Sequence, residues 1–305
     1  MAHLNPPKLT AEERAVLFKR PLWKPVLQTV FVAAVYAVGV FIVTNPALGP
    51  ARFLGCPLLS LILAGCLAAG HDCFHSSLYN GKRTNRVAGA IWCALVLTNF
   101  SATKHSHLVH HRYTGEERDS EPRFNVPTFS AYVMQFLRPA ILIPRAVLKA
   151  ARVVSGRLVP PHLATERARK GAREDAALIL LWAAIAGGLT VWAPLAMVFA
   201  YWIPIAFFPA AAIAIAMPEH HRCGDGDDLL DVTRTTETNW LARLLIWNSN
   251  YHVEHHLYPA VPSCNLRKLH RRVRPTLRHF APSYRAFHAG LVRDLVAREQ
   301  RTYRP

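Results

Sequence analysis

The chain has 305 residues, 51% of them hydrophobic, and a formal net charge of +17. The hydrophobic residues gather in long uncharged runs, and the run 176–218 alone extends over 43 positions. Since a membrane span needs roughly 20 apolar residues, this run is too long for the buried helix of a water-soluble domain. The composition therefore predicts an all-α integral membrane protein.

The first 24 residues are polar and basic. They lack the short apolar stretch and small-residue cleavage site of a signal peptide, so we expect no cleaved leader. Uncharged runs then predict two helical hairpins. The first has spans at about 25–44 and 53–71, and the second at about 176–194 and 196–217.

Between the hairpins, the uncharged run 87–103 has 17 residues and is short for a span. A crossing here would also place the histidines before it and after it on opposite sides of the membrane. We therefore expect a re-entrant or interfacial segment. The stretch 127–148 is amphipathic, is interrupted by Arg138 and Arg145, and is expected to lie along the membrane surface.

After the second hairpin, residues 219–305 are soluble in character and are expected to form a helical cytoplasmic cap. We expect 1–305 to form a single membrane-bound domain. Basic residues precede the first span, fill the middle segment and recur in the C-terminal part, whereas the two short loops within the hairpins hold one arginine together. The positive-inside rule then places both termini and the middle segment in the cytoplasm, as in a multi-pass protein of a bacterial inner membrane. Anionic lipid accounts for this charge, so no nucleic-acid partner is expected.

Histidine is the most unevenly distributed residue type. Eleven of the sixteen histidines fall in four short clusters, which are His71 and His75; His105, His107, His110 and His111; His220 and His221; and His252, His255 and His256. Every cluster lies at the predicted cytoplasmic end of a span or in a neighbouring segment. The clusters can therefore converge into one site that caps the helices.

The spacing within the clusters is suited to metal binding. In HDCFH, two imidazoles stand at i and i+4, about 5–6 Å apart at Cβ on one helix face. HLVHH and HVEHH share the pattern H-x-x-H-H, in which we expect i and i+3 to share a face and i+4 to point elsewhere, so that one box serves two ions. Imidazole suits iron, zinc, copper and nickel. Eight or nine imidazoles fit two ions with four or five ligands each.

Acidic residues flank these histidines. Asp72, Glu219 and Glu254 each adjoin a clustered histidine, and Asp119 and Glu121 follow the second cluster. A carboxylate that accepts the second ring N–H fixes the tautomer and orientation of a ligand histidine. We expect these acids to support the ligands in this way.

Two other metal functions fit the sequence less well. Zinc fits the ligand type, but the zinc-protease motifs H-E-x-x-H and H-x-x-E-H are absent from the sequence. A histidine-rich metal transporter is a remote alternative, because transporters bind their cargo near the middle of the bilayer and these histidines stand at the ends of spans.

The segments HDCFH, HSHLVHH and NYHVEHHLYPAVP resemble the three histidine boxes of the membrane-bound fatty acid desaturase and hydroxylase superfamily, over roughly residues 25–275. The resemblance implies a non-haem di-iron site that activates O2 and attacks an unactivated C–H bond. The implied iron ligands are His71, His75, His107, His110, His111, His220, His252, His255 and His256.

Other polar residues are expected to lie next to the ligands without binding the metal themselves. His105 lies outside the second box, and His221 is the less favoured of the two histidines after the fourth span. Asn248 and Asn250 precede the third box, where some family members place a polar residue near the metal. Ser120 replaces a proline that many relatives carry. The first box has three intervening residues rather than four, which weakens the expectation of an acyl-CoA substrate.

The implied function is desaturation of a fatty acyl chain or membrane lipid. The alternative is a hydroxylase or ketolase acting on a fatty, terpenoid, carotenoid or small substrate. The chain has no H-P-G-G, C-x-x-C or G-x-G-x-x-G motif, so an external donor such as a ferredoxin, rubredoxin or cytochrome is expected. Its candidate docking residues, which could equally bind lipid headgroups, are Arg267, Lys268, Arg271 and Arg272.

Overall fold

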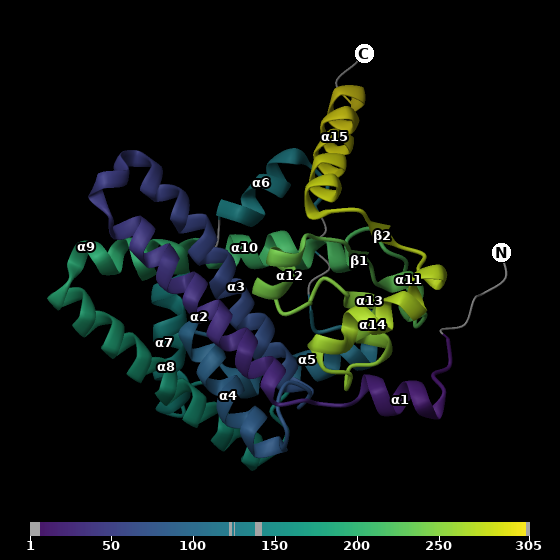
Figure 1. The fold of residues 1–305 in the computed structure, drawn as a ribbon, viewed down its shortest axis with the longest axis horizontal. Helices are drawn as coiled ribbons and strands as arrows, with labels where there is room; N and C mark the ends of the chain where they lie inside the picture. Colours follow the sequence, from purple (N-terminus) through teal and green to yellow (C-terminus); the bar gives the residue numbers. More distant parts are fainter. Residues whose placement is uncertain (1–6, 122–123, 125, 138–141, 303–305) are drawn as a thin grey trace.

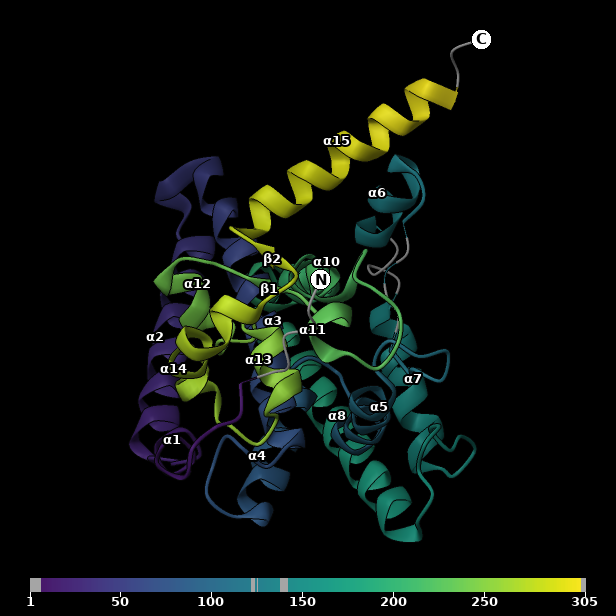
Figure 2. The same ribbon diagram turned by 90° about the vertical axis from the view of Figure 1, so that its right-hand side faces the viewer.

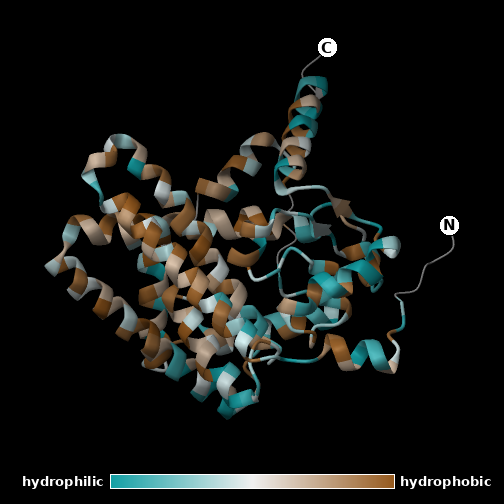
Figure 3. Cartoon of the chain, in the orientation of Figure 1, coloured by the Kyte–Doolittle hydropathy of each residue, from teal (hydrophilic) through white to brown (hydrophobic). Residues whose placement is uncertain are grey.

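The computed structural model describes residues 7–121, 124, 126–137 and 142–302. Within these residues the chain is helical apart from loops and one pair of two-residue strands. Figure 1 shows a bundle of long helices beside a group of short ones. In Figure 3 the bundle carries most of the hydrophobic colouring, and the short helices are more hydrophilic. The predicted all-α architecture is confirmed.

The first hairpin consists of α2 (Trp23–Thr44) and α3 (Gly55–Phe74), joined by a 3-10 segment (Pro46–Leu54). The apolar window of α2 is only 22% buried, and that of α3 is 61% buried. Side chains such as Phe41, 65% exposed, point outward from α2 because a spanning helix presents apolar surface to lipid. The hairpin therefore places α3 at the centre of the bundle.

The second hairpin runs through α8 (Glu166–Trp192), α9 (Pro194–Met197), a π-helical turn (Val198–Trp202) and α10 (Ile203–His220). Helix α8 begins ten residues before the predicted start of the span, because Thr165 caps its N-terminus and polar turns precede the apolar stretch. In the described residues, four helical segments are long and apolar enough to cross a membrane. The four predicted spans are therefore found.

The uncharged run 87–103 does not form a single helix. It is divided between α4 (Lys82–Leu95) and α5 (Phe100–Tyr113), whose axes differ by 103°. The side chain of Asn99 accepts a hydrogen bond from the backbone N–H of Ala102 and so begins α5 anew. This bend brings the second histidine cluster against the end of α3.

Helices α6 (Phe129–Leu137) and α7 (Leu142–Val154) occupy the stretch predicted to lie along the membrane surface. Residues 138–141, which include the predicted interruption at Arg138, lie outside the described residues. Helix α7 packs its apolar side on α8 and leaves its basic side exposed.

The cap that follows α10 consists of α11 (Leu229–Val232), β1 (Thr235–Thr236), α12 (Trp240–Leu245), α13 (His252–Leu257), α14 (Ser263–Val273) and β2 (Phe280–Ala281). The two strands pair in parallel. Helix α1 (Ala11–Leu17) packs on α14. Figure 2 shows α15 (Tyr284–Thr302) projecting away from the rest of the molecule.

A glycine brings the cap close to the bundle. A Cβ added at Gly65 of α3 would lie 1.9 Å from the carbonyl oxygen of Leu245 in α12. No side chain fits there, so the absence of a Cβ allows the backbone of the cap to approach α3 directly. This contact sets the position of the chain that leads into α13.

Candidate metal centre

The first histidine box lies at the C-terminal end of α3. His71 occupies its last turn, and His75 is the residue that ends the helix. Their ring centroids are 5.4 Å apart, as the i, i+4 spacing predicts. The ring of His71 also lies 4.4 Å from the rings of both His107 and His255. The first box therefore meets the other two boxes.

The second and third boxes come from α5 and α13. His107 and His110 in α5 are 4% and 1% exposed. In α13, His252, His255 and His256 are 7%, 4% and 3% exposed. So many nearly buried imidazoles on two short helices are costly unless their polar atoms are satisfied.

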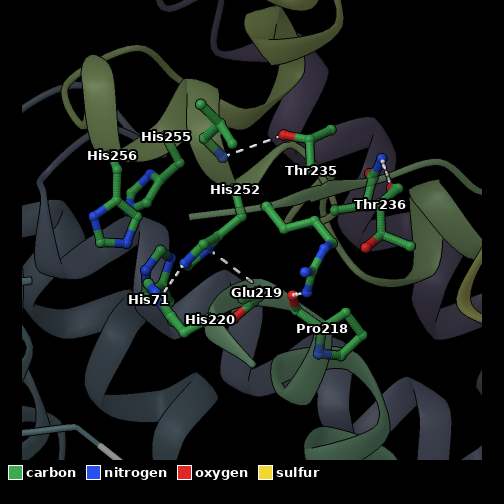
Figure 4. Close-up of polar contacts among 12 residues, drawn as sticks. His71, Pro218, Glu219, His220, Thr235, Thr236, His252, His255 and His256 are labelled. Carbon is green, nitrogen blue, oxygen red and sulfur yellow. Dashed lines mark hydrogen bonds and ion pairs between the residues drawn. The ribbon is translucent and has the colours of Figure 1, made fainter. Parts of the chain in front are cut away.

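The nine predicted ligands fall into two groups. Each residue offers one ring nitrogen, and the nitrogens of a group all lie within 4.8 Å of one another. The first group contains His71, His75, His107, His111 and His255, and the second contains His110, His220, His252 and His256. Figure 4 shows the ring of His252 between His220, a member of the second group, and the carboxylate of Glu219, which belongs to neither group. This arrangement is compatible with two neighbouring ions, and their binding stays a prediction.

The pairing within each H-x-x-H-H box differs from the one that the spacing suggested. In α5, His107 and His111 share a group and His110 belongs to the other. In α13, His252 and His256 share a group and His255 belongs to the other. The prediction that i and i+3 act together is therefore wrong. Positions i and i+4 differ by only about 40° around a helix with 3.6 residues per turn, and i+3 lies on the other side of i.

Pairs of ring nitrogens face each other within each group. Nε2 of His111 lies 3.0 Å from Nε2 of His255, and Nε2 of His220 lies 2.8 Å from Nε2 of His252. A neutral imidazole offers one donor and one acceptor nitrogen. Two nitrogens bound to one metal at about 2.0–2.1 Å each also lie about 3 Å apart. The spacing is compatible with a shared ion in each group.

Two ring nitrogens of the first group have no partner in the described part of the chain. Nε2 of His75 and Nε2 of His107 are buried without a hydrogen bond. An unsatisfied buried polar atom destabilises a fold by roughly 1–3 kcal/mol. A bound metal ion would remove this cost, so the residues present fit a metal.

Two carboxylates orient histidines of α5. The Nδ1–H of His107 donates to Glu121 at 2.8 Å, and the Nδ1–H of His110 donates to Asp119 at 2.8 Å. Burial acts to raise the pKa of Asp119, but the hydrogen bonds from His110 and from the backbone of Glu121 lower it below its ordinary value. Both bonds leave Nε2 of the ring free to face its group.

Two other acidic residues lie farther from histidine ring nitrogens. Glu219 Oε1 lies 3.5 Å from Nδ1 of His252, and Asp72 Oδ1 lies 3.8 Å from Nδ1 of His71. The backbone carbonyl of Val232 accepts a hydrogen bond from Nδ1 of His220 at 2.9 Å. A backbone acceptor of this kind cannot be recognised from sequence.

Glu254 does not support the histidines beside it in the sequence. It is fully buried, and it accepts hydrogen bonds from Nδ1–H of His270 and from the hydroxyl of Thr235, each at 2.6 Å. The Thr235 hydroxyl also accepts the backbone N–H of Val253. This network ties α13 to α14 and β1. His270 stands outside the four histidine clusters, and no local pattern in the sequence links it to the third box.

The two remaining clustered histidines stand outside both groups. Nδ1 of His105 bonds the backbone carbonyl of Ser101 at 2.7 Å. Nδ1 of His221 bonds the carbonyl of Phe124 at 2.9 Å. The structure thus brings His220, and not its neighbour, into the second group.

The two asparagines before the third box also have other contacts. The backbone N–H of Asn248 donates to the carbonyl of Arg243, in a left-handed turn where Asn248 has φ 58°. The side-chain amide of Asn250 donates to the carbonyl of Thr236. Among the described contacts, neither amide bonds a histidine. Both residues therefore shape the approach to α13.

The rings of the cap are held neutral by their surroundings. Burial, followed by the proximity of other histidines, lowers the pKa of His252, His255 and His256 well below the usual value. The same causes lower the pKa of His75 to about 3. A neutral ring keeps a lone pair for a metal at physiological pH.

A cavity of about 520 Å3 adjoins the first group. His71, His107 and His255 form part of its wall, and small residues such as Ala64 and Ala68 form another part. Sites for small ligands usually have volumes of 300–1,000 Å3 and mostly apolar walls. The histidines therefore face a space that an apolar molecule can enter.

The basic residues predicted to dock a partner lie on α14. Arg267, Lys268, Arg271 and Arg272 are all exposed. Arg272 forms an ion pair with Glu13 of α1, with Nε 3.2 Å from Oε1. The other three have no ion pair with a described residue.

The described part of the chain thus combines four helical segments that could cross a membrane with two groups of histidines that could hold metal, as in a metal-binding membrane protein. The sequence profile of fatty acid desaturases matches residues 48–288. This match covers more than half of the chain, and the protein belongs to the fatty acid desaturase family.

One characterised relative is similar over a short stretch. An 86-residue segment is 29% identical to sn-1 linoleoyl-lipid 6-desaturase of Synechocystis sp.. The segment is 28% of this chain and 24% of the relative. This match is therefore too short to assign the relative's activity to this chain.

Proposed function

We propose that the protein is an O2-dependent membrane oxidase that introduces a double bond into a fatty acyl chain or membrane lipid. The observation that carries the proposal is the division of nine histidines into groups of five and four beside an apolar cavity. Membership of the fatty acid desaturase family supports an oxidoreductase, and the similarity to a linoleoyl-lipid desaturase of Synechocystis supports a lipid-bound acyl chain. The whole chain, 1–305, is proposed as one domain.

Each histidine group is proposed to hold one iron ion. Imidazole is a suitable ligand for iron, and the unpaired Nε2 atoms of His75 and His107 support metal in the first group. When bound, two iron ions would supply the O2 activation that an unactivated C–H bond requires. The protein chain itself orients the histidine rings and the substrate and excludes water. Glu121 and Asp119 hold two rings in place, and the apolar walls orient a chain beside the histidines and exclude water.

The centre is proposed to face the cytoplasm of a bacterial cell, with both termini on the same side of the inner membrane. The support is the distribution of Lys and Arg, which is dense outside the hairpins and sparse in their short loops.

A separate acidic protein of the ferredoxin, rubredoxin or cytochrome type is proposed to supply electrons. Its candidate docking surface is the exposed basic side of α14, with Arg267, Lys268 and Arg271. Opposite charges accelerate and orient such encounters.

The test is lipid analysis by mass spectrometry of bacterial membranes that contain the protein and a donor system. The control is the double variant His107→Ala/His255→Ala, which removes two rings of the first group. A lipid about two mass units lighter, absent from the control, is expected for desaturation. A lipid about sixteen units heavier would instead assign hydroxylation. Iron-loaded protein that gives neither product from any host lipid contradicts the proposed activity on membrane lipids.

A further inference from the structure

The cavity beside the histidines continues into a second one. The second cavity has a volume of about 470 Å3. The two share six wall residues, which are Leu67, Ala102, Thr103, Lys149, Pro160 and Ala212. The two cavities are therefore parts of one space, which runs from the first histidine group to the underside of α7.

The walls of the second cavity are mostly apolar. Helices α8 and α10 contribute residues such as Ile179, Ile205 and Phe208. The charged residues of this wall are Arg145 and Lys149, and no acidic residue accompanies them. Both lie on α7 at i and i+4, so they share one helix face. Both are exposed, and Lys149 lines the first cavity as well.

These two cations have no partner within the described part of the chain. Two basic residues of other helices are paired: Arg86 of α4 bonds Asp175 at 2.6 Å, and Arg173 of α8 contacts Glu166. Neither Arg145 nor Lys149 forms an ion pair or a hydrogen bond with a described residue. Two adjacent unpaired cations on the wall of a mostly apolar space are complementary to an oxyanion that carries an apolar chain.

We propose that Arg145 and Lys149 bind the oxyanion of the substrate while its apolar chain extends through the shared space toward the histidines. The substrate is then an anionic acyl lipid whose polar end is a carboxylate or a phosphate. Sterols, carotenoids and neutral glycolipids lack this group and are excluded. The inference rests on the proposed function only in taking the histidine end of the space as the reacting end.

Attraction of α7 to any anionic membrane surface is the competing explanation. The helix offers a matched control, because Arg152 is an exposed cation on the same helix but lines neither cavity. A specific site depends on Arg145 and Lys149 alone, whereas general attraction depends on all three cations.

The test measures binding to the purified full-length protein in a neutral detergent, so it does not require turnover. The fluorescent fatty acid cis-parinaric acid is the anionic probe, and its methyl ester is the neutral one. Arg145→Gln/Lys149→Gln is expected to raise the Kd for the acid at least tenfold and to leave the Kd for the ester unchanged. Arg152→Gln and Lys149→Arg should leave both values unchanged. Unchanged ester binding also shows that the variant is folded.

Equal weakening by Arg152→Gln, or an unchanged Kd for the acid in the double variant, would overturn the proposal. Competition identifies the source of the oxyanion: displacement of the probe by palmitate alone indicates a carboxylate, and displacement by lysophosphatidic acid indicates a phosphate. Charge-dependent binding without any oxidised lipid product would refute the proposed function and leave the anion site standing.

Discussion

The carboxylate of Glu254 lies 2.6 Å from Nδ1 of His270, sixteen positions along the chain, although Glu254 directly precedes a histidine of the third box. This bond connects α13, which carries three clustered histidines, to α14. His270→Phe leaves a buried carboxylate short of a donor, at a cost of roughly 1–3 kcal/mol. We expect a lower Tm and a loss of bound iron.

His270→Asn retains a donor near the position of Nδ1 and is the conservative variant. It should recover much of the iron content, and His162→Asn, at an exposed histidine, should match the unaltered protein. Full iron content in the phenylalanine variant would show that Glu254 holds α13 without His270.

The two histidine groups should lose metal separately. His75→Ala removes one ligand from the group of five, and His256→Ala removes one from the group of four. In each variant the iron content measured by mass spectrometry is expected to fall from about two ions per chain toward one, because the other group keeps its rings.

His105→Ala is the control, since His105 bonds Ser101 and lies outside both groups. It should retain two ions. Complete loss of iron from every single variant would mean that the two groups bind metal only as a unit.

Removing the carboxylates that orient the second box should weaken metal binding without removing a ligand. Asp119→Asn and Glu121→Gln are each expected to lower iron affinity about 10–100-fold, as measured by competition with a chelator. The larger effect is expected at Asp119, whose side chain is 6% exposed, compared with 37% for Glu121. Glu117→Gln, at an exposed acid, should leave the affinity unchanged.

The stability of the metal-free protein should depend on histidine protonation. The pKa of His75 is about 3 in the fold and 6.5 for an unperturbed histidine. Between these values the unfolded chain binds a proton that the fold does not, so stability is lost as the pH falls below 6.5. Each such group contributes about 1.4 kcal/mol per pH unit.

Thermal unfolding in detergent between pH 7.5 and 5 measures this effect. The Tm is expected to fall with the pH, and His75→Asn should make the dependence shallower. A Tm that rises on acidification would contradict the lowered pKa values of the buried rings.

The basic side of α14 should govern use of the electron donor. Arg267→Glu/Lys268→Glu is expected to raise the KM for an acidic donor about tenfold and to leave the iron content unchanged, because rim charges act mainly on association. Arg271→Glu should act in the same direction, and the effect should diminish at high salt. Arg301→Glu on α15, an exposed residue, is the control and should not alter the KM.

Much of the site was predictable from local pattern. Uncharged runs of about 20 residues identify spans, because lipid accepts little else. The clustering of histidines near the ends of those runs predicts that His71, His107 and His255 are neighbours, and their rings do meet. The acids Asp119 and Glu121 were identified by their closeness in sequence to the second box.

Only the tertiary structure decided which of these residues contact one another across different helices. The sequence by itself determined the membrane spans and the histidine set, because both depend on residue types within one helix. The meeting of His111 with His255 depends on how α5 packs against α13, and the pairing of Glu254 with His270 depends on how α14 packs. Arg145 and Lys149 of α7 line the space that leads to the histidines only because α7 packs over it. Contacts between distant segments are set by packing rather than by spacing in the sequence.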